Sequence, residues 1–566
     1  MRRASSTIIL FFAFLLAAQS LMVPLLLPQP VHSSAQTVVT RQSRINTDDI
    51  RFGFNTKVTD GSSPYLWQVE PTLTILSTGR VLCGWKEADS HNGPGLRVGF
   101  AYSTDMGKTW STNILMDPVG PGEQQSDPWL LKDDDDNAYF TFLEYGGTGE
   151  GMGVAKTTDG GLSWQGPVQA SDTEGYLDDK ETVCVDENGN LYMVWDHSVT
   201  ETTANLVFTK STNGGASFQP TTVLGSWEER GGIPYIACTP NGTLYVSTIL
   251  DSTGGQIDTI YMTKSVDFGA TWTPPIRVNP ISTDVIDIIT VTALDSEGNV
   301  FVAFAEGSDT DRDIYITRSE DGGTTWSPPV RVNDVTTNMQ RMTELYIDED
   351  DNLHVAWLDA RLDEWNYYYS FSNDSGVTFS PNIRISAEGF SLLYNRPGDY
   401  ITLRGGPNGL AIVWTDGRGV DHDIYYAKQD LSAPVITHVP VPSWYVNTPL
   451  TLQAEVTDDD HVESVILYLG SGAASRQVLV MNEVTDDIYE VTIPAEYLTG
   501  TQLEYVIVAQ DTAGRETRLY ITGDEGYTLP LSPITPTLVL TLVIAVVVIV
   551  IVLIFAIWYL RHKPAK

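Results

Sequence analysis

The sequence of 566 residues has few cysteines, few histidines and few basic side chains. Its 3 Cys include no CxxC pair, which excludes a disulfide-framed small domain and a zinc ribbon. The 8 His are scattered without an HxxxH pair, so no zinc site is expected. Only 33 Lys and Arg oppose 72 Asp and Glu, and the net charge is −39. A polyanion without a basic stripe repels phosphates, so no nucleic-acid partner is expected.

The composition instead favours strands and turns. The chain has 47 Gly and 26 Tyr, and hydrophobic residues make up 42% of it, which is enough for extended cores. Its length indicates more than one domain.

The N-terminal region has the pattern of an export signal. Arg2 and Arg3 precede an apolar run over residues 8–27, and the small residues 33–35 offer a cleavage site. We therefore expect a signal peptide over residues 1–35. Because the apolar run is long, an uncleaved anchor is the alternative.

The C-terminal region has the pattern of a membrane span. Residues 537–560 carry no charge and would form a helix of about 36 Å. Basic residues follow in 561–566, as expected of a cytoplasmic tail. The sequence therefore predicts a single-pass protein of the cell membrane with its bulk outside the cell.

A short motif recurs six times between residues 103 and 379, with the pattern Ser/Thr-x-Asp/Asn-x-Gly-x-x-Trp/Phe. Its third position recurs at steps of 54, 54, 54, 54 and 53 residues. In each motif the Asp or Asn can bond to nearby backbone N–H groups, Gly supplies a positive φ, and the aromatic residue locks the hairpin. The third positions are Asp105, Asp159, Asn213, Asp267, Asp321 and Asp374.

Each repeat contains four runs typical of strands, which predicts an all-β protein with a β-propeller over residues 37–430. Hairpin turns recur seven times, so we expect seven blades, with six as the alternative. The last unit lacks the motif and a fourth strand, so we expect residues 37–46 to close the ring.

The period ends near residue 433. Residues 433–531 contain alternating strands and turns over roughly a hundred residues, which fits a β-sandwich of the immunoglobulin or fibronectin III type. We expect this domain to separate the propeller from the membrane.

The six motifs resemble the Asp-box (BNR) repeats of the sialidase, or neuraminidase, superfamily, and the resemblance covers residues 37–430. It implies a propeller that acts on or recognises glycans outside the cell, and if it is an enzyme, a glycoside hydrolase. Asp boxes also occur in propellers that share only the fold with sialidases. A non-catalytic adhesion or ligand-binding protein, or a structural protein of the envelope, is therefore the alternative.

Charged residues lie where the inner strands of the blades are expected to begin. Such groups converging on a central funnel suit a hydroxylated or carboxylated ligand, and the alternative is a set of ion pairs around water. Aligned on the hairpin turns, these positions are Glu70, Asp127, Asp179, Lys180, Glu181, Arg230, Asp287, Arg341, Asp399 and Tyr400.

The sialidase resemblance implies roles for several of these residues. A sialidase needs arginines that clamp the sugar carboxylate, a carboxylic acid, and a tyrosine nucleophile beside a glutamate. By chain order, Asp127 would be the acid/base, Tyr400 the nucleophile and Glu229 its partner. The clamp would consist of Arg230, Arg341 and Arg396.

One family feature is absent. The first arginine of sialidases lies in an Arg-Ile-Pro motif, where this chain reads Val69-Glu70-Pro71. A carboxylate pair of Glu70 and Asp127 would instead suit hydrolysis of a neutral glycan, because paired carboxyl groups are the general glycosidase solution.

Other polar motifs have structural interpretations. Residues 133–136 are four acids that could hold Ca²⁺, although a solvated turn is the alternative, and no other cofactor or metal is expected. In the Trp-x-Asp-x-Arg motifs at 357–361 and 414–418, we expect the aspartate to pair with the arginine and hold a loop. The three cysteines lie in strands and are expected to be free thiols, with one bridge after export as the alternative.

Overall fold

The computed structural model describes two compact units, one from Ile45 to Leu431 and one from Met1–Arg44 together with Ser432–Lys566. Within them, the described residues are 38–40, 50–90, 95–119, 124–146, 151–172, 177–200, 203–227, 232–251, 257–280, 285–308, 310–392, 398–419, 421–440, 444–445, 447–470, 477–499, 502–519 and 527–530.

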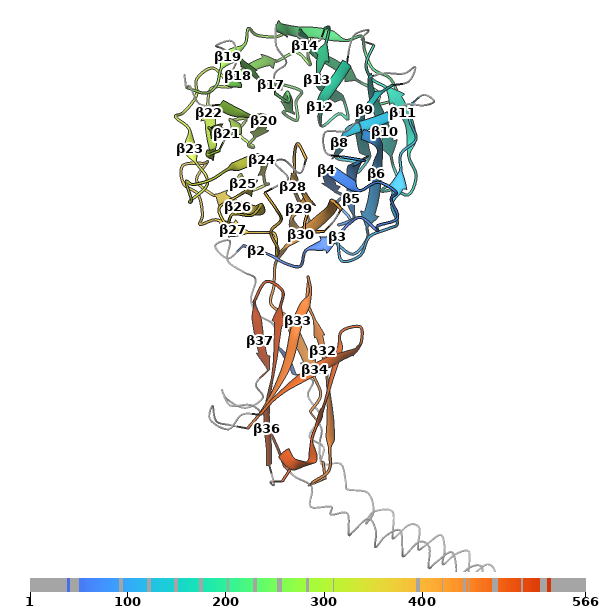
Figure 1. Cartoon of the computed structure of the whole chain (residues 1–566), viewed down its shortest axis with the longest axis vertical. Coiled ribbons are helices and arrows are strands. Elements are labelled where there is room, and N and C mark those ends of the chain that lie inside the picture. Colours follow the sequence, from blue (N-terminus) through green and yellow to red (C-terminus); the bar gives the residue numbers. More distant parts are fainter. Residues whose placement is uncertain are drawn as a thin grey trace, which may run out of the picture. The chain divides into compact units, whose positions relative to one another are not determined.

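The unit Ile45–Leu431 is a seven-bladed β-propeller, as predicted (Figure 1). Each blade is one antiparallel sheet whose first strand is innermost. Blade 1 consists of β4 (Trp67–Ile75), β5 (Val81–Ala88), β6 (Gly95–Ser103) and β7 (Ile114–Leu115). Blade 2 consists of β8 (Gln124–Lys132), β9 (Ala138–Tyr145), β10 (Gly151–Thr157) and β11 (Gln165–Gln169). Blade 3 consists of β12 (Leu177–Val185), β13 (Leu191–Ser198), β14 (Ala204–Ser211) and β15 (Thr222–Trp227). Blade 4 consists of β16 (Tyr235–Cys238), β17 (Leu244–Asp251), β18 (Ile257–Ser265) and β19 (Ile276–Arg277). Blade 5 consists of β20 (Val285–Leu294), β21 (Val300–Gly307), β22 (Arg312–Ser319) and β23 (Val330–Arg331). Blade 6 consists of β24 (Gln340–Ile347), β25 (Leu353–Asp359), β26 (Asn366–Ser372) and β27 (Ile383–Arg384).

Blade 7 is completed by the N-terminal part of the chain. It consists of β28 (Thr402–Gly406), β29 (Gly409–Asp416) and β30 (Asp423–Asp430), and β30 also pairs with β2 (Arg51–Phe52) and β3 (Thr56–Lys57). The ring is therefore closed by residues 51–57, and the expectation that residues 37–46 close it is wrong. Residues 38–40 form β1, which belongs to the second unit and pairs there with β31 (Val435–His438). A run of three β-branched residues fits many sheet edges, so the sequence did not specify its partner.

The six Asp boxes share one set of hydrogen bonds, as in the first box. Ser103 Oγ donates to Asp105 Oδ1 at 2.8 Å and accepts from the Gly107 backbone N–H at 2.7 Å. The Thr109 backbone N–H donates to Asp105 Oδ1 at 2.9 Å. Gly107 has a φ of 88°, a conformation that glycine adopts without strain. These bonds explain why the motif recurs with so little variation.

The box aromatics join each blade to the one before it. Trp164 of blade 2 packs edge-on against Phe100 of blade 1, with ring centroids 5.1 Å apart. Trp110 of blade 1 contacts Tyr426 of blade 7 in the same way, at 5.3 Å. Buried aromatic contacts of this kind fix the angle between neighbouring sheets.

Blade 7 has no box, and the N-terminal strand supplies the missing aromatic contact. Phe52 on β2 lies edge-on to Tyr369 on β26 of blade 6, with centroids 5.2 Å apart. Tyr369 precedes the box serine Ser372 by three residues, as Phe100 precedes Ser103 in blade 1. The N-terminal strand therefore closes both the hydrogen-bonded sheet and the hydrophobic contact between blades 6 and 7.

The Trp-x-Asp-x-Arg motifs pair as expected. The indole N–H of Trp357 donates to Asp359 at 2.8 Å, and Arg361 binds the same carboxylate at 2.7 Å. The second motif repeats this pattern, with Arg418 bonded to Asp416. Both carboxylates thus accept hydrogen bonds from a tryptophan and an arginine of their own motif. These bonds hold the loops that follow the second strands of blades 6 and 7.

The second unit is a small β-structure of the barrel or sandwich kind, built from a nine-stranded sheet with the path β1-β31-β32-β35-β34-β33-β36-β37 and with β38 beside β36. Burial alternates along β32, which places Leu452, Ala454 and Val456 in the core. The remaining elements are β32 (Leu450–Thr457), β33 (Val462–Leu469), β34 (Gln477–Thr485), β35 (Ile488–Ile493), η1 (Ala495–Tyr497), β36 (Gln502–Asp511), β37 (Glu516–Leu519) and β38 (Tyr527–Pro530).

No helix within the described ranges is long and apolar enough to cross a membrane. The predicted signal peptide at 1–35, the predicted span at 537–560 and the tail at 561–566 all lie outside the described residues.

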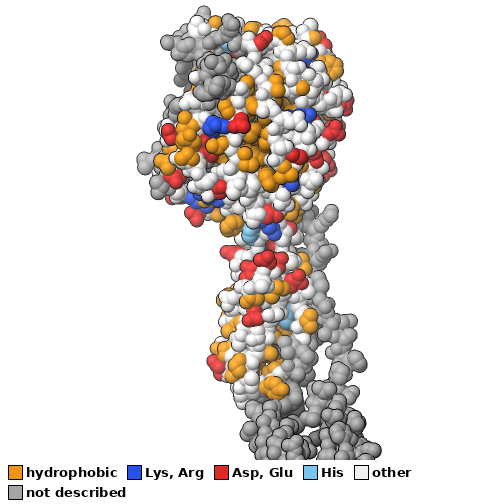
Figure 2. Space-filling view, turned by 90° about the vertical axis from the view of Figure 1, so that its right-hand side faces the viewer, with side chains coloured by type: hydrophobic (Ala, Val, Ile, Leu, Met, Phe, Trp, Pro, Cys, Tyr) orange, Lys and Arg blue, Asp and Glu red, His pale blue; other side chains and the backbone are white. Residues whose placement is uncertain are grey.

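The acidic character of the chain is visible on its surface. On the face drawn in Figure 2, acidic side chains are scattered among uncharged ones, and basic side chains are few. The negative charge is thus spread over this face, which is typical of a charge that maintains solubility.

Candidate functional site

Several of the charged residues predicted at the starts of the inner strands lie at β-bulges: Glu70, Asp127, Lys180, Asp287 and Arg341. The pairing of inner strands with second strands shifts between Val69 and Thr72 in blade 1, and similarly in blades 2, 3, 5 and 6. At the bulges, Glu70, Asp127 and Lys180 have positive φ values of 56°, 48° and 62°. Non-glycine residues with positive φ concentrate at sites where strain serves a function.

The local sequence explains two of these bulges. Glu70 and Asp127 are each followed by proline, Pro71 and Pro128. Proline has no backbone N–H to donate, so it interrupts the ladder at this point of the strand. The interruption re-aims the preceding carboxyl group.

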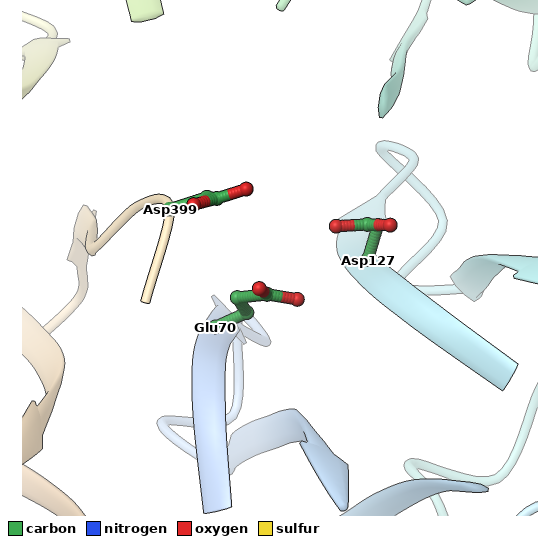
Figure 3. A group of neighbouring side chains, drawn as sticks. All are labelled: Glu70, Asp127 and Asp399. Atoms are coloured by element: carbon green, nitrogen blue, oxygen red, sulfur yellow. The ribbon is translucent and has the colours of Figure 1, made fainter. Parts of the chain in front are cut away.

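Three carboxyl groups meet at this end of the inner strands. Glu70 from β4, Asp127 from β8 and Asp399, which precedes β28, point toward one another (Figure 3). One oxygen of each lies within 4.8 Å of one oxygen of the others. All three residues are buried, at 2%, 6% and 2% exposure. We refer to Glu70, Asp127 and Asp399 as the carboxylate cluster.

Two lysines neutralise part of this negative charge. Lys180 of blade 3 pairs with Asp399 and lies 3.6 Å from Asp127 Oδ1. Lys86 on β5 lies 3.4 Å from Glu70 Oε1, while Glu70 Oε2 is buried without a hydrogen-bond partner. The Lys180 side chain is 23% exposed, so it is the solvent-facing member of the network.

Burial makes the network asymmetric in its protonation. Desolvation by burial is the largest influence on the pKa of Glu70, and the negative charges of Asp127 and Asp399 add to it. Together they outweigh the positive charges of Lys86 and Lys180, so the pKa of Glu70 is raised to about 8. The carboxylates around Lys180 outweigh its burial and raise its pKa well above the ordinary value. At neutral pH the cluster thus combines a protonated carboxyl group with a charged ammonium group.

Glu181, next to Lys180, is a further buried carboxyl group. Burial, followed by the charge of Asp127, raises its pKa well above the ordinary value. Its Oε2 is buried without a hydrogen-bond partner, and its Oε1 accepts a long bond of 3.4 Å from Thr141. It therefore adds a further buried carboxyl group close to Asp127.

Tyr400 lies beside the carboxylate cluster, but its hydroxyl is engaged. It donates to the carbonyl oxygen of Pro128 at 2.9 Å. Burial, followed by the charge of Glu70, raises its pKa well above the ordinary value. A phenol nucleophile requires an activated oxygen, whereas here the hydroxyl supports the bulge that holds Asp127.

Arg341, predicted as part of the arginine clamp, forms an ion pair with Asp287 inside the propeller. Its guanidinium binds Asp287 at 2.9 and 3.3 Å, and Arg312 binds the same carboxylate at 3.1 Å. Despite burial, these two arginines hold the pKa of Asp287 below its ordinary value. The three other predicted site residues, Glu229, Arg230 and Arg396, lie outside the described residues.

A buried ion pair further along the inner strands was not anticipated from the sequence. Arg404 on β28 binds Glu344 on β24, and the other Glu344 oxygen, Oε2, has no hydrogen-bond partner. Burial raises the pKa of Glu344 to about 7, because Arg404 only partly offsets it. The sequence feature that could have indicated this pair is a charged residue, Glu344 or Arg404, in the middle of an inner strand.

A cavity of about 680 Å³ lies at the opposite ends of the inner strands. It is lined by the ends of β4 and β8 and by the hairpins around Asp348 and Gly406. Asp348 there is already bonded to Asn352 and His354, at 2.9 and 3.0 Å. The cavity is thus lined by residues other than those of the carboxylate cluster, and Asp348 stabilises its own hairpin.

Two groups of acids could hold a cation by their chemistry. The carboxylate cluster has three converging oxygens, but Lys180 already places an ammonium group beside Asp127 and Asp399. In the acidic turn, Asp133 accepts bonds from Asn137 and Tyr139, and Asp136 pairs with Lys132 at 3.0 Å. Lys180 thus offsets negative charge in the cluster, whereas in the turn Asp133 and Asp136 are already bonded to neighbouring residues.

Comparison with known proteins supports the repeat assignment. Residues 101–112 match the BNR/Asp-box repeat family, and no curated protein sequence matches the chain. Solved structures of similar fold include an ulvan lyase (11% identity, 69% of this chain and 96% of that one, TM-score 0.44). Others are the NanB sialidase of Streptococcus pneumoniae (14%, 67% and 70%, 0.39) and an α-L-arabinanase of Penicillium chrysogenum (13%, 68% and 99%, 0.38). One repeat of the chain thus matches the BNR/Asp-box family, and the fold is similar to that of several carbohydrate-active enzymes at low identity.

Proposed function

We propose that the propeller is a glycoside hydrolase that acts on glycans outside the cell. The observation that carries this proposal is the convergence of Glu70 and Asp127, whose nearest oxygens lie within 4.8 Å. Glycosidases use two carboxyl groups whose environments separate their protonation states. Glu70, with its pKa raised to about 8, is protonated at neutral pH, and Asp127 carries an ion pair with Lys180.

In this mechanism Glu70 donates its proton to the glycosidic oxygen as the bond to the sugar breaks. Asp127 attacks the anomeric carbon, and water then releases the sugar while Glu70 takes back a proton. Retaining glycosidases place their carboxyl groups about 5 Å apart, whereas inverting enzymes leave room for water between them. The close approach of Glu70 and Asp127 favours the retaining course. Lys180 leaves Asp127 when the sugar enters.

A neutral glycan fits this site better than a sialic acid. Where the Arg-Ile-Pro motif of sialidases has its arginine, this chain has Val69, and the acidic Glu70 follows it. Arg341, one of the three arginines of the predicted clamp, is bound to Asp287 on two atoms. A sialate carboxylate would have to compete with this buried pair.

One observation favours a second function, the binding of a glycan without turnover. Lys180 pairs with both Asp127 and Asp399, and the Tyr400 hydroxyl donates a hydrogen bond to the Pro128 carbonyl oxygen. Ion pairs and hydrogen bonds of this kind also hold the side chains of a rigid binding surface in place.

Turnover on a panel of neutral and sialylated oligosaccharides tests the proposal. Glu70→Gln and Asp127→Asn should each lower kcat by a factor of at least about 10² while binding persists. Glu87→Gln is the control, because Glu87 is an equally buried carboxyl group of blade 1 that bonds to Trp85 at 2.7 Å. Binding without turnover of any glycan would establish the second function, and neither activity would indicate a structural role.

We also propose that the chain is exported and anchored by residues 537–560, with the second unit as an immunoglobulin-like spacer. The support is the uncharged stretch and the basic residues after it. Protease treatment of intact cells should remove the propeller and leave a membrane-bound C-terminal fragment. A chain recovered in the soluble fraction, or protected from protease, would contradict this location.

A further inference from the structure

Two of the three cysteines lie on neighbouring inner strands. Cys184 is on β12 of blade 3 and Cys238 on β16 of blade 4, and both are partly buried. Both side chains pack against the same hydrophobic cluster between these blades, which includes Ile236 and Phe208. The two thiols therefore occupy one interface.

Hydrogen bonds on both sides of the cysteines hold the two strands together. Thr182 Oγ1 donates to the Pro234 carbonyl oxygen at 3.0 Å and accepts from the Ile236 N–H at 3.1 Å. Beyond the cysteines, the Glu187 N–H donates to the Pro240 carbonyl oxygen at 3.3 Å. Cys184 and Cys238 are thus at corresponding positions between two fixed contacts.

The side-chain directions agree with this placement. Alternate residues of a strand point to the same side, so Cys184 points as Thr182 does, toward blade 4. By the same rule Cys238 points as Ile236 does, into the shared cluster. Cys238 is also near enough to influence the pKa of the Cys184 thiol.

We propose that Cys184 and Cys238 form a disulfide that joins blades 3 and 4 once the chain reaches an oxidising compartment. Each thiol loses a proton. One thiolate attacks an oxidant of the disulfide class, such as oxidised glutathione, and releases one reduced thiol. The second thiolate then attacks the mixed disulfide and releases the other. Two protein thiols are oxidised, and one small disulfide is reduced to two thiols.

The environment of the pair also predicts the rate of this step. Burial, followed by the neighbouring Cys238 thiol, raises the pKa of Cys184 well above the ordinary value. Since the thiolate is the reactive form, closure should be slow at neutral pH and faster in alkaline solution. Cys83, fully buried on β5 of blade 1, provides an internal control.

The test is to incubate the full-length chain with excess oxidised glutathione, denature it in a thiol-alkylating reagent and map the peptides by mass spectrometry. We expect one alkylated cysteine, Cys83, and one cross-linked peptide pair containing Cys184 and Cys238. After reduction all three cysteines should be alkylated, and the melting temperature of the reduced chain should be lower by about 5 °C.

Variants separate this bridge from other outcomes. Cys83→Ser should retain the bridge, and Cys184→Ser should abolish it together with the effect of reduction on the melting temperature. Three alkylated cysteines after oxidation, a bridge to Cys83, or stable glutathione adducts on Cys184 would each overturn the proposal. The wild-type alkylation pattern decides even if a variant folds poorly. The outcome is independent of glycan turnover.

Discussion

The ammonium group of Lys180 pairs with Asp399 and lies 3.6 Å from Asp127, although the three residues come from blades 3, 7 and 2. A single side chain thus links strands that are far apart in the sequence across one end of the propeller. Like charges on Asp127 and Asp399 would otherwise repel each other in a poorly solvated place.

Removing this ammonium should therefore destabilise the propeller. We expect Lys180→Met to lower the free energy of unfolding by about 3 kcal/mol at pH 7, because it leaves two buried carboxylates without their ammonium partner. Urea unfolding at pH 7 measures the loss.

Lys132→Met is the matched control for this measurement. Lys132 is similarly exposed, at 29%, and pairs at 3.0 Å with Asp136 on a surface turn. Its loss should amount to less than about 1 kcal/mol. Equal losses in the two variants would show that Lys180 does not organise the cluster.

The pH dependence of turnover should report the protonation of Glu70. With a pKa of about 8, Glu70 is protonated in the folded protein at pH 7 and loses its proton as the pH rises. Because only the protonated form can donate to the leaving oxygen, kcat should fall about tenfold per pH unit above pH 8. The residual activity of Glu70→Gln should lack this fall, and a flat profile in the wild type would remove Glu70 from the acid role.

Replacement of Tyr400 separates the two enzymatic interpretations. Because its hydroxyl donates to Pro128, we expect Tyr400→Phe to change kcat by less than about tenfold. A sialidase-type nucleophile would instead lose about 10³-fold or more. Trapping of a covalent sugar adduct and peptide mapping would identify the attacking residue directly.

The propeller could be predicted because its determinants are local. Each box carries its own hydrogen bonds, as between Ser103, Asp105 and Thr109, so its sequence alone specifies the turn. The regular spacing of the boxes and hairpins then gave the number of blades. The same alignment placed Glu70, Asp127 and Asp399 at one end of the inner strands, where they lie together.

The contacts between distant elements were less predictable. Lys86 on β5 is paired with Val69 on β4, and the bulge that follows Val69 brings Glu70 within 3.4 Å of Lys86. No sequence pattern indicated this change of register. The direction of the Tyr400 hydroxyl and the partner of Arg341 depend on residues of other blades. Likewise, residues 38–40 were expected to complete the last blade, but so short a strand pairs with β31 instead.

The first box allows a test of the local contacts. Asp105→Ala removes the acceptor for Ser103 and Thr109, so we expect a loss of about 1–2 kcal/mol in the free energy of unfolding. Asp105→Asn should cost less, because the third box already carries Asn213, which accepts the corresponding bonds and donates to Ser217 at 2.8 Å. Denaturant unfolding of both variants measures the difference. Equal losses would contradict a role for the side-chain oxygen.

Closure of the ring by the N-terminal strand can be tested with two phenylalanines that are two residues apart. Phe52 is 8% exposed and packs on Tyr369, whereas Phe54 is 48% exposed. We expect Phe52→Ala to lower the free energy of unfolding by about 3 kcal/mol, because it opens a cavity between blades 6 and 7. Phe54→Ala should lower it by less than about 1 kcal/mol. If the two losses were equal, Phe52 would not replace the missing box aromatic, and the hydrogen bonds of β2 and β3 alone would close the ring.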